Sequence, residues 1–181
     1  TAGERALDKL RARENPGRSW YLDLALVLEY WTPGGSSGRS YHHTAPINMV
    51  YALREALRIA VGDDWLPTAW ERHRRAHHAL RDALAVLGCE RVAPDGEQLH
   101  PLLAVRVPEG LDETGIRRAL LHDHRIEISG GLGPFAGRVW RIGVMGEGAR
   151  PQPQERLVRA LAAQLRADPT DALAALAEGW A

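Results

Sequence analysis

The sequence predicts an α+β fold, in which a small antiparallel sheet with helices on one face is preceded by long helices. Three observations lead to this prediction. Apolar residues recur at helical spacing through most of residues 4–88. Strand-like alternation begins only afterwards, with Leu103, Val105 and Val107. The later elements then follow in the order strand, helix, strand, strand, helix, which favours a sheet covered by helices.

Four helices are expected in the first half of the chain, because apolar side chains lie three or four residues apart in each of them. They span residues 4–13, about 21–31, 46–61 and 67–88. Pro46 suits a first helical position, and Gly62 and Gly88 are typical helix stops. The glycine- and serine-rich residues 32–40 are predicted to form a loop.

The second half is expected to alternate between short strands and helices. The predicted strands are residues 103–107, 126–128 and 139–142, with a glycine-rich loop between the last two. Asp112 can cap a helix that extends to about His122. Two further helices are predicted, from 153 to 166 and from Asp168-Pro169 to Gly179.

Charge balance and cysteine usage exclude several classes of protein. Lysine and arginine together number 23, as do aspartate and glutamate, whereas a nucleic-acid-binding protein usually carries a basic excess. No apolar run approaches the roughly 18 residues of a membrane span, and the chain opens into an amphipathic helix rather than a signal peptide. Cys89 is the sole cysteine, which fits a reducing compartment. We therefore expect a cytoplasmic protein with no nucleic-acid or membrane partner.

The tetrapeptide Tyr41-His42-His43-Thr44 precedes a predicted helix, whose first N–H groups are free. A tyrosine hydroxyl, a threonine hydroxyl and the positive helix end could together hold a phosphate. The same residues could instead form a capping loop, with Thr44 at the N-cap, Tyr41 packed and the histidines hydrogen-bonded locally. Spacing alone favours the capping loop.

Arg141 lies in a predicted strand, so its side chain points either to a pocket or into the protein. A guanidinium can bind a carboxylate through two parallel hydrogen bonds, which suits amino-acid and 2-oxo-acid substrates. The alternatives are a structural ion pair, for instance with Glu127, or simple exposure to solvent, and spacing alone favours these alternatives. The nearby Gly130-Gly131-Leu132-Gly133 lacks the spacing of a dinucleotide-binding loop, and a hairpin would use such glycines as readily as a ligand site.

His73 and His77 are four residues apart on the predicted helix 67–88 and could chelate a metal ion. Without a third ligand in view, such a pair is more typical of packing or of an interface, so no metal site is expected. The arginines of this helix (Arg72, Arg74, Arg75 and Arg81) are interpreted as a solvated face.

Five segments in a consistent order resemble one family. They are Trp20-Tyr21-Leu22-Asp23, Tyr41-His42-His43-Thr44-Ala45-Pro46, Leu53-Arg54-Glu55-Ala56-Leu57, IEISGGLGP from Ile126 to Pro134, and WRIGVMG from Trp140 to Gly146. Together they resemble the alanine–glyoxylate (serine–pyruvate) aminotransferases, which are fold-type I enzymes that depend on pyridoxal 5'-phosphate (PLP). The resemblance extends from about Trp20 to about Leu165.

This resemblance implies a C-terminal half of such an enzyme. Residues 1–62 would be the remnant of the large PLP domain with the interdomain helix, and residues 63–181 the small C-terminal α+β domain. The family is homodimeric, and its tyrosine and threonine that match Tyr41 and Thr44 contact the PLP phosphate of the partner subunit. The arginine that matches Arg141 holds the substrate carboxylate.

The only lysine, Lys9, does not match the lysine that holds PLP as a Schiff base in this family. No catalytic residue is therefore assigned, and the chain is expected to be inactive alone. The parent enzyme would transfer an amino group from alanine or serine to glyoxylate or a related 2-oxo acid. Two alternatives stay open: a sibling PLP enzyme (an aminoethylphosphonate or ureidoglycine aminotransferase, or a desulfurase), and a non-catalytic module that binds a partner chain.

Overall fold

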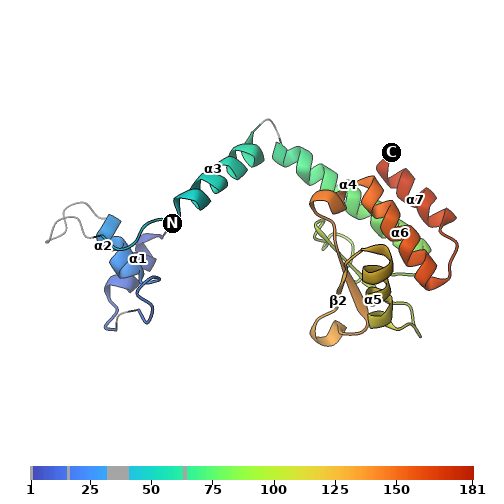
Figure 1. Cartoon of the computed structure of the whole chain (residues 1–181), viewed down its shortest axis with the longest axis horizontal. Helices are drawn as coiled ribbons and strands as arrows, with labels where there is room; N and C mark the ends of the chain where they lie inside the picture. The colour runs from blue at the N-terminus through green and yellow to red at the C-terminus, as the bar shows by residue number, and fades with distance from the viewer. Residues whose placement is uncertain (1, 16, 32–40, 63–64) are drawn as a thin grey trace. The chain divides into compact units, whose positions relative to one another are not determined.

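The computed structural model describes residues 2–15, 17–31, 41–62 and 65–181 (Figure 1). The chain divides into two compact units, Thr1–Ile59 and Ala60–Ala181. The predicted loop 32–40 lies outside the described residues. The assignment of the first segment to a large PLP domain stays a prediction.

The first unit contains three helices: α1 (Glu4–Arg11), α2 (Leu24–Trp31) and most of α3 (Ile47–Val61). The start of α2 is later than the predicted residue 21, because Asp23 acts as its cap. One carboxylate oxygen of Asp23 accepts a hydrogen bond from the Ala25 N–H at 2.9 Å, and the other accepts one from the Gly17 N–H at 3.1 Å. These backbone N–H groups, with Ala25 first, hold the pKa of Asp23 below its usual range.

Helices α1, α2 and α3 bury no residue, so the first unit has little interior of its own. Among its described residues only Asp23 and His42 are buried. Large apolar side chains are exposed instead, including Trp31, Met49 and Tyr51. A surface of this kind is typical of a region that packs against another chain or domain.

The second unit holds the α+β part of the chain. Its helices are α4 (Trp65–Val86), α5 (Glu113–His124), α6 (Pro151–Leu165) and α7 (Thr170–Trp180). Its strands are β1 (Leu102–Arg106), β2 (Ser129–Gly130) and β3 (Val139–Gly143). Two 3₁₀ turns, η1 (Gly133–Phe135) and η2 (Gly146–Ala149), lie among the described residues. Figure 1 shows α4, α6 and α7 side by side. None of the helices in the described residues is long and apolar enough to cross a membrane.

The three strands form an antiparallel sheet in the order β1-β3-β2. Leu103 pairs with Ile142 and Val105 pairs with Trp140, and these four side chains join one buried cluster with the helices. Because successive residues of a strand point to opposite faces, the helices cover one face of the sheet. The predicted α+β class, with helices on one face of an antiparallel sheet, is confirmed.

The strand predicted at residues 126–128 is wrong, since the paired residues are Ser129 and Gly130. Helix α5 ends with Arg125 in the left-handed conformation (φ 57°), and the Ile126 N–H bonds back to the Leu120 carbonyl. The chain therefore leaves the helix by a capping turn, and Ile128 is buried without a strand partner. Asp112 caps this helix as predicted, accepting a hydrogen bond from the Gly115 N–H at 3.0 Å.

Close packing of small residues joins α7 to α4. A methyl group added at Gly179 would come within 2.6 Å of the Cα and Cβ atoms of Ala79. Buried Gln154 links the same elements: its amide donates to the Ala76 carbonyl at 2.9 Å and accepts a hydrogen bond from the Trp180 indole at 2.9 Å. These contacts hold α4, α6 and α7 together.

Candidate functional site

Arg141 lies in the middle of β3 on the face of the sheet opposite the helices. Its neighbours Trp140 and Ile142 point into the core, so Arg141 shares the open face with its cross-strand partners Ala104 and Ser129. Its side chain is half-buried. The central strand therefore fixes the base of the side chain, while the open face leaves its end accessible.

The guanidinium of Arg141 is held by backbone rather than by a carboxylate. Its Nε donates a hydrogen bond to the Gly130 carbonyl at 2.8 Å. Glu127, the suggested ion-pair partner, makes no such bond, and no salt bridge of Arg141 forms within the described part of the chain. The two terminal nitrogens therefore keep their donors for another acceptor.

A half-buried ion pair packs behind Gly130. Glu113, only 5% exposed, accepts hydrogen bonds from Arg117 at 2.5 and 3.3 Å. A methyl group at Gly130 would stand 3.0 Å from the Glu113 carboxylate and 3.2 Å from the Arg117 Nε. This support was missed at the sequence level, although the four-residue spacing of Glu113 and Arg117 on a helix is a recognisable signal.

Tyr41 and Thr44 come together at the start of α3. The two hydroxyl groups are 2.5 Å apart and hydrogen-bonded, and both residues are exposed. No side-chain hydrogen bond of Thr44 caps the helix within the described residues, and the first turn of α3 carries no acidic residue. Two hydroxyls and a positive helix end whose first turn has no acidic side chain thus lie close together in the first unit.

His42 and His43 hold this corner in place through aromatic contacts. His42 is buried and stacks on Trp20 with ring centres 4.2 Å apart, while His43 lies against Tyr21 at 4.5 Å. The two histidines also share a hydrogen bond of 2.5 Å between their Nδ1 atoms. The local hydrogen bonding predicted for the histidines is therefore present, whereas Tyr41 is 67% exposed rather than packed.

Arg141 belongs to the second unit, whereas Tyr41 and Thr44 belong to the first. Tyr41 and Thr44 are hydrogen-bonded to each other, whereas Arg141 is hydrogen-bonded to the Gly130 carbonyl. Cys89 is buried, and burial raises the pKa of its thiol to about 12, so it is no candidate nucleophile.

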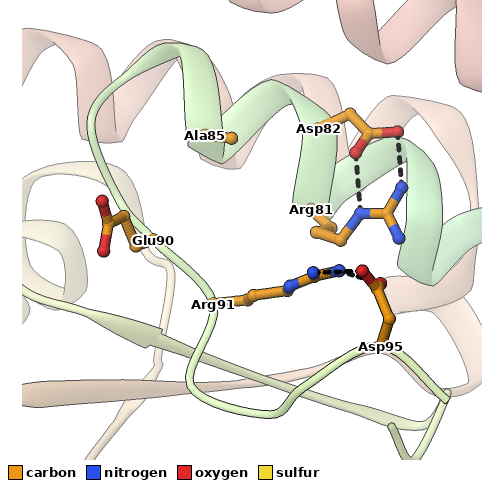
Figure 2. A pocket seen from close by; sticks show the side chains of 6 residues that line it. All are labelled: Arg81, Asp82, Ala85, Glu90, Arg91 and Asp95. Carbon is orange, nitrogen blue, oxygen red and sulfur yellow. Dashed lines mark hydrogen bonds and ion pairs between the residues drawn. The ribbon is translucent and has the colours of Figure 1, made fainter.

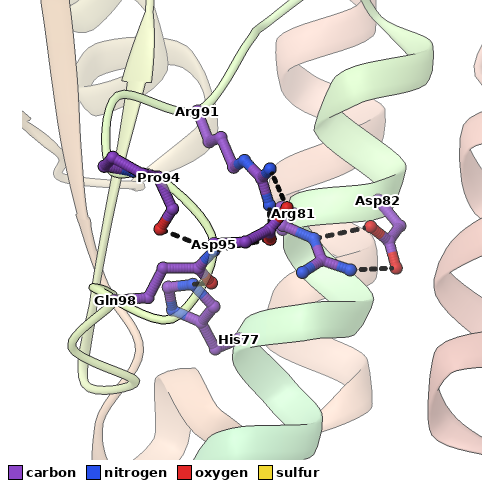
Figure 3. Close-up of polar contacts among 7 residues, drawn as sticks. All are labelled: His77, Arg81, Asp82, Arg91, Pro94, Asp95 and Gln98. Carbon is purple, nitrogen blue, oxygen red and sulfur yellow. Dashed lines mark hydrogen bonds and ion pairs between the residues drawn. The ribbon is translucent and has the colours of Figure 1, made fainter.

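His73 and His77 do not share a ligand. His73 bonds to the Ala69 carbonyl at 2.5 Å, whereas buried His77 bonds to the Gln98 side chain at 3.0 Å. Figure 3 shows His77 beneath the segment that carries Pro94, Asp95 and Gln98. No group of three or more metal-ligating side chains occurs in the ranges that the structure describes.

A cavity of about 490 Å³ lies beside α4, away from Arg141, and is lined by six residues: Arg81, Asp82, Ala85, Glu90, Arg91 and Asp95 (Figure 2). Each arginine here already has a carboxylate partner. Arg81 is held by Asp82 at 2.7 and 3.0 Å, and Arg91 forms a two-bond pair with Asp95. This cavity therefore offers no free guanidinium to a carboxylate.

Comparison with known proteins places this geometry in context. No family model matches the chain. Alanine–glyoxylate aminotransferase of Drosophila melanogaster is 37% identical over 149 residues, covering 81% of this chain and 37% of the relative. (S)-ureidoglycine–glyoxylate transaminase of Bacillus subtilis (strain 168) is 36% identical over 137 residues, covering 76% of this chain and 32% of the relative.

Solved structures agree with the sequence relatives. The crystal structure of alanine–glyoxylate aminotransferase from Nostoc sp. has a TM-score of 0.76 and 42% identity, covering 92% of this chain and 43% of that one. Ureidoglycine–glyoxylate aminotransferase from Bacillus subtilis has a TM-score of 0.83 and 33% identity, covering 99% of this chain and 46% of that one. By sequence and by fold, the chain is therefore a relative of the alanine–glyoxylate aminotransferases that spans less than half of their length.

Proposed function

We propose that this chain is the C-terminal portion of a PLP-dependent aminotransferase that transfers an amino group from alanine or serine to glyoxylate or a related 2-oxo acid. The observation that carries the proposal is the guanidinium of Arg141, which a backbone carbonyl orients on the open face of the sheet. The similarity to two glyoxylate aminotransferases supports the choice of acceptor.

Arg141 would bind the carboxylate that both substrates share. Because its Nε is committed to Gly130, its two terminal nitrogens form the fork that fits a carboxylate end-on. An amino acid and a 2-oxo acid both carry this group next to the reacting carbon. One fixed arginine would therefore orient the donor and the acceptor alike.

Tyr41 and Thr44 would bind the phosphate of PLP in the partner subunit of a homodimer. Their paired hydroxyls, followed by the positive end of α3, fit the charge and the hydrogen-bonding needs of a phosphate. When bound, PLP takes up the amino group from the donor and passes it to the acceptor. In this scheme the chain supplies phosphate binding and substrate orientation.

Lys9 would not hold the cofactor, so the chain would be inactive alone. Lys9 is exposed in the last turn of α1. Incubation with PLP followed by borohydride and peptide mass spectrometry should leave Lys9 unmodified. Stoichiometric modification of Lys9 would contradict this, and an upstream reading frame without a lysine-bearing PLP domain would favour the non-catalytic module.

Ureidoglycine is the second candidate for the amino donor, because the Bacillus subtilis relative is named for it. Both candidates place the same carboxylate on Arg141, so this residue cannot distinguish them. Initial rates of the complete enzyme with alanine, serine and ureidoglycine, each at saturating glyoxylate, would rank the donors directly.

The decisive test is Arg141→Lys in the complete enzyme. Lysine keeps the charge but loses the planar two-bond grip, so kcat/KM should fall on the order of 10²-fold while PLP retention is spared. Arg138→Lys is the matched control, because Arg138 is exposed near the start of the same strand. Near-normal kcat/KM with a lowered melting temperature would assign Arg141 a structural role instead.

Thr44→Val should show the opposite pattern. Loss of the hydroxyl should speed PLP dissociation through the phosphate, while the KM values of the substrates change little. Thr68→Val, at an exposed position of α4, controls for the substitution itself. Unchanged PLP dissociation in Thr44→Val would remove the threonine from the cofactor site.

A further inference from the structure

A second cavity in the second unit, of about 760 Å³, is lined by three arginines. Arg72 comes from α4, Arg150 from the residue before α6, and Arg156 from the second turn of α6. Glu147 is the one acidic residue in the lining, and Trp180 forms an apolar wall. The arginines converge from separate segments of the chain, and the cavity carries an excess of positive charge.

The charges in this cavity are poorly compensated. Glu147 pairs with Arg150 at 3.3 Å, but both side chains are more than half exposed, so the attraction is weak. Among the described residues, Arg156 donates a hydrogen bond to the His124 carbonyl alone, at 3.1 Å. The Nε of Arg72 is buried and has no hydrogen-bond partner among the described residues. No described carboxylate forms a salt bridge with Arg72, so the charge of this guanidinium is also uncompensated.

The N-terminus of α6 adds to the positive potential. The helix has 15 residues, its first turn contains no acidic side chain, and the side chain of its cap residue Arg150 makes no capping hydrogen bond. Pro151 and Pro153 have no N–H, so Gln152 supplies the free backbone donor at this end. The helix dipole favours an anion at this position.

The cavity beside Arg81 provides a comparison within the same molecule. It is also lined by arginines, but both of them, Arg81 and Arg91, form ion pairs with an aspartate (Figure 2). Aspartates therefore neutralise the arginines of the cavity beside Arg81, whereas the arginines of the cavity at the start of α6 keep donors without an acceptor. Arginine content alone does not distinguish the two cavities, whereas charge compensation does.

We propose that the cavity at the start of α6 binds a phosphate group, as inorganic phosphate or as a phosphate monoester. The charge of a dianion balances the net charge of three arginines and one glutamate. Guanidinium groups also bind oxyanions through paired hydrogen bonds. The cavity is of the size that holds a small organic ligand, so an ester has room beyond its phosphate. The site lies in the second unit and is independent of the proposed function of Tyr41 and Thr44.

The test is isothermal titration of the 181-residue chain with inorganic phosphate, in a chloride buffer of constant ionic strength. A saturable site that does not depend on Thr44 is expected. Arg72→Gln and Arg156→Gln should each raise the Kd about tenfold or more. Arg81→Gln is the matched control, since it removes the same charge from the same helix as Arg72 and should leave the Kd unchanged. Glycerol 3-phosphate, titrated in parallel, distinguishes an ester site from an inorganic phosphate site by its relative Kd.

Two further variants keep the outcome clear. Glu147→Gln should lower the Kd by removing the opposing carboxylate, a gain that misfolding cannot imitate. Thr44→Val should leave the Kd unchanged, which separates this site from the proposed PLP phosphate contact. Absence of saturable binding, equal loss in Arg81→Gln, or loss in Thr44→Val would each overturn the proposal.

Discussion

At the scale of single residues, His77 shows how burial sets the pH response. It is 2% exposed, bonded to Gln98, and its ring centre lies 5.6 Å from that of His100 and 5.9 Å from that of His78. Burial lowers the pKa of His77 below its ordinary value of 6.5, and the same cause lowers the pKa of His78. Protonation therefore favours the unfolded chain over the folded one.

The expected consequence is a loss of stability in mild acid. Because the folded pKa lies below the unfolded value, the stabilisation is complete above about pH 6.5 and falls as the pH drops through the unfolded pKa toward the folded one. The melting temperature of the chain should decrease from pH 7.5 to pH 5, and His77→Gln should flatten this slope. His122→Gln, at an exposed position on α5, is the control. Equal melting temperatures across this range in the unmodified chain would contradict the argument.

Arg141 shows what sequence reasoning can and cannot find in a site. A lone arginine within a strand could be recognised as a candidate for carboxylate binding, and the family resemblance selected the same residue. Its acceptor could not be found, because the Gly130 carbonyl carries no side-chain signal. Glu127, suggested as an ion-pair partner, is exposed and forms no salt bridge with Arg141 among the described residues.

At the scale of secondary structure, long periodic helices could be predicted, whereas short pairings could not. Helix α4 follows its apolar spacing closely, and α5 begins at its aspartate cap as expected. Strand β2 is only two residues long, so its existence depends on hydrogen bonds to β3 rather than on its own composition. The hydrogen bonds between β2 and β3 form at Ser129 and Gly130. The apolar residues just before them pack in the core instead.

The contact between α4 and α7 gives a prediction at this scale. Gly179→Ala would place a methyl group 2.6 Å from the Ala79 backbone, and this contact can be relieved only by moving a helix. Overpacking of this kind costs about 1–3 kcal/mol of unfolding free energy. Urea unfolding should show this loss, whereas Gly143→Ala, whose new methyl group would meet only the end of Met145 at 3.9 Å, should change stability by less than about 0.5 kcal/mol. An unchanged midpoint for Gly179→Ala would mean that the helices are less closely packed than described.

At the scale of the whole molecule, the two units bury apolar residues very unequally. All the buried apolar residues of the described chain belong to the second unit, whereas α3 exposes Met49, Tyr51 and Leu53 at 71%, 67% and 59%. Water contact with so much apolar surface is unfavourable by about 25 cal/mol per Å², which favours any association that covers it. The sequence could indicate this surface through the apolar spacing of α3, but periodicity cannot specify what covers it.

We therefore expect the chain to form a dimer or a larger assembly, with the Tyr41–Thr44 loop close to a contact between chains. Sedimentation velocity at micromolar concentration should detect the assembly, and Leu53→Asp should shift the equilibrium toward monomer by placing a charge on α3. Leu99→Asp is the matched control, because Leu99 is 73% exposed in the second unit and lies outside the proposed contact. A monodisperse monomer for the unmodified chain, or equal dissociation by Leu99→Asp, would contradict association through the first unit. Because the second unit has its own buried core, Leu53→Asp should leave its unfolding midpoint unchanged, so loss of association can be distinguished from loss of folding.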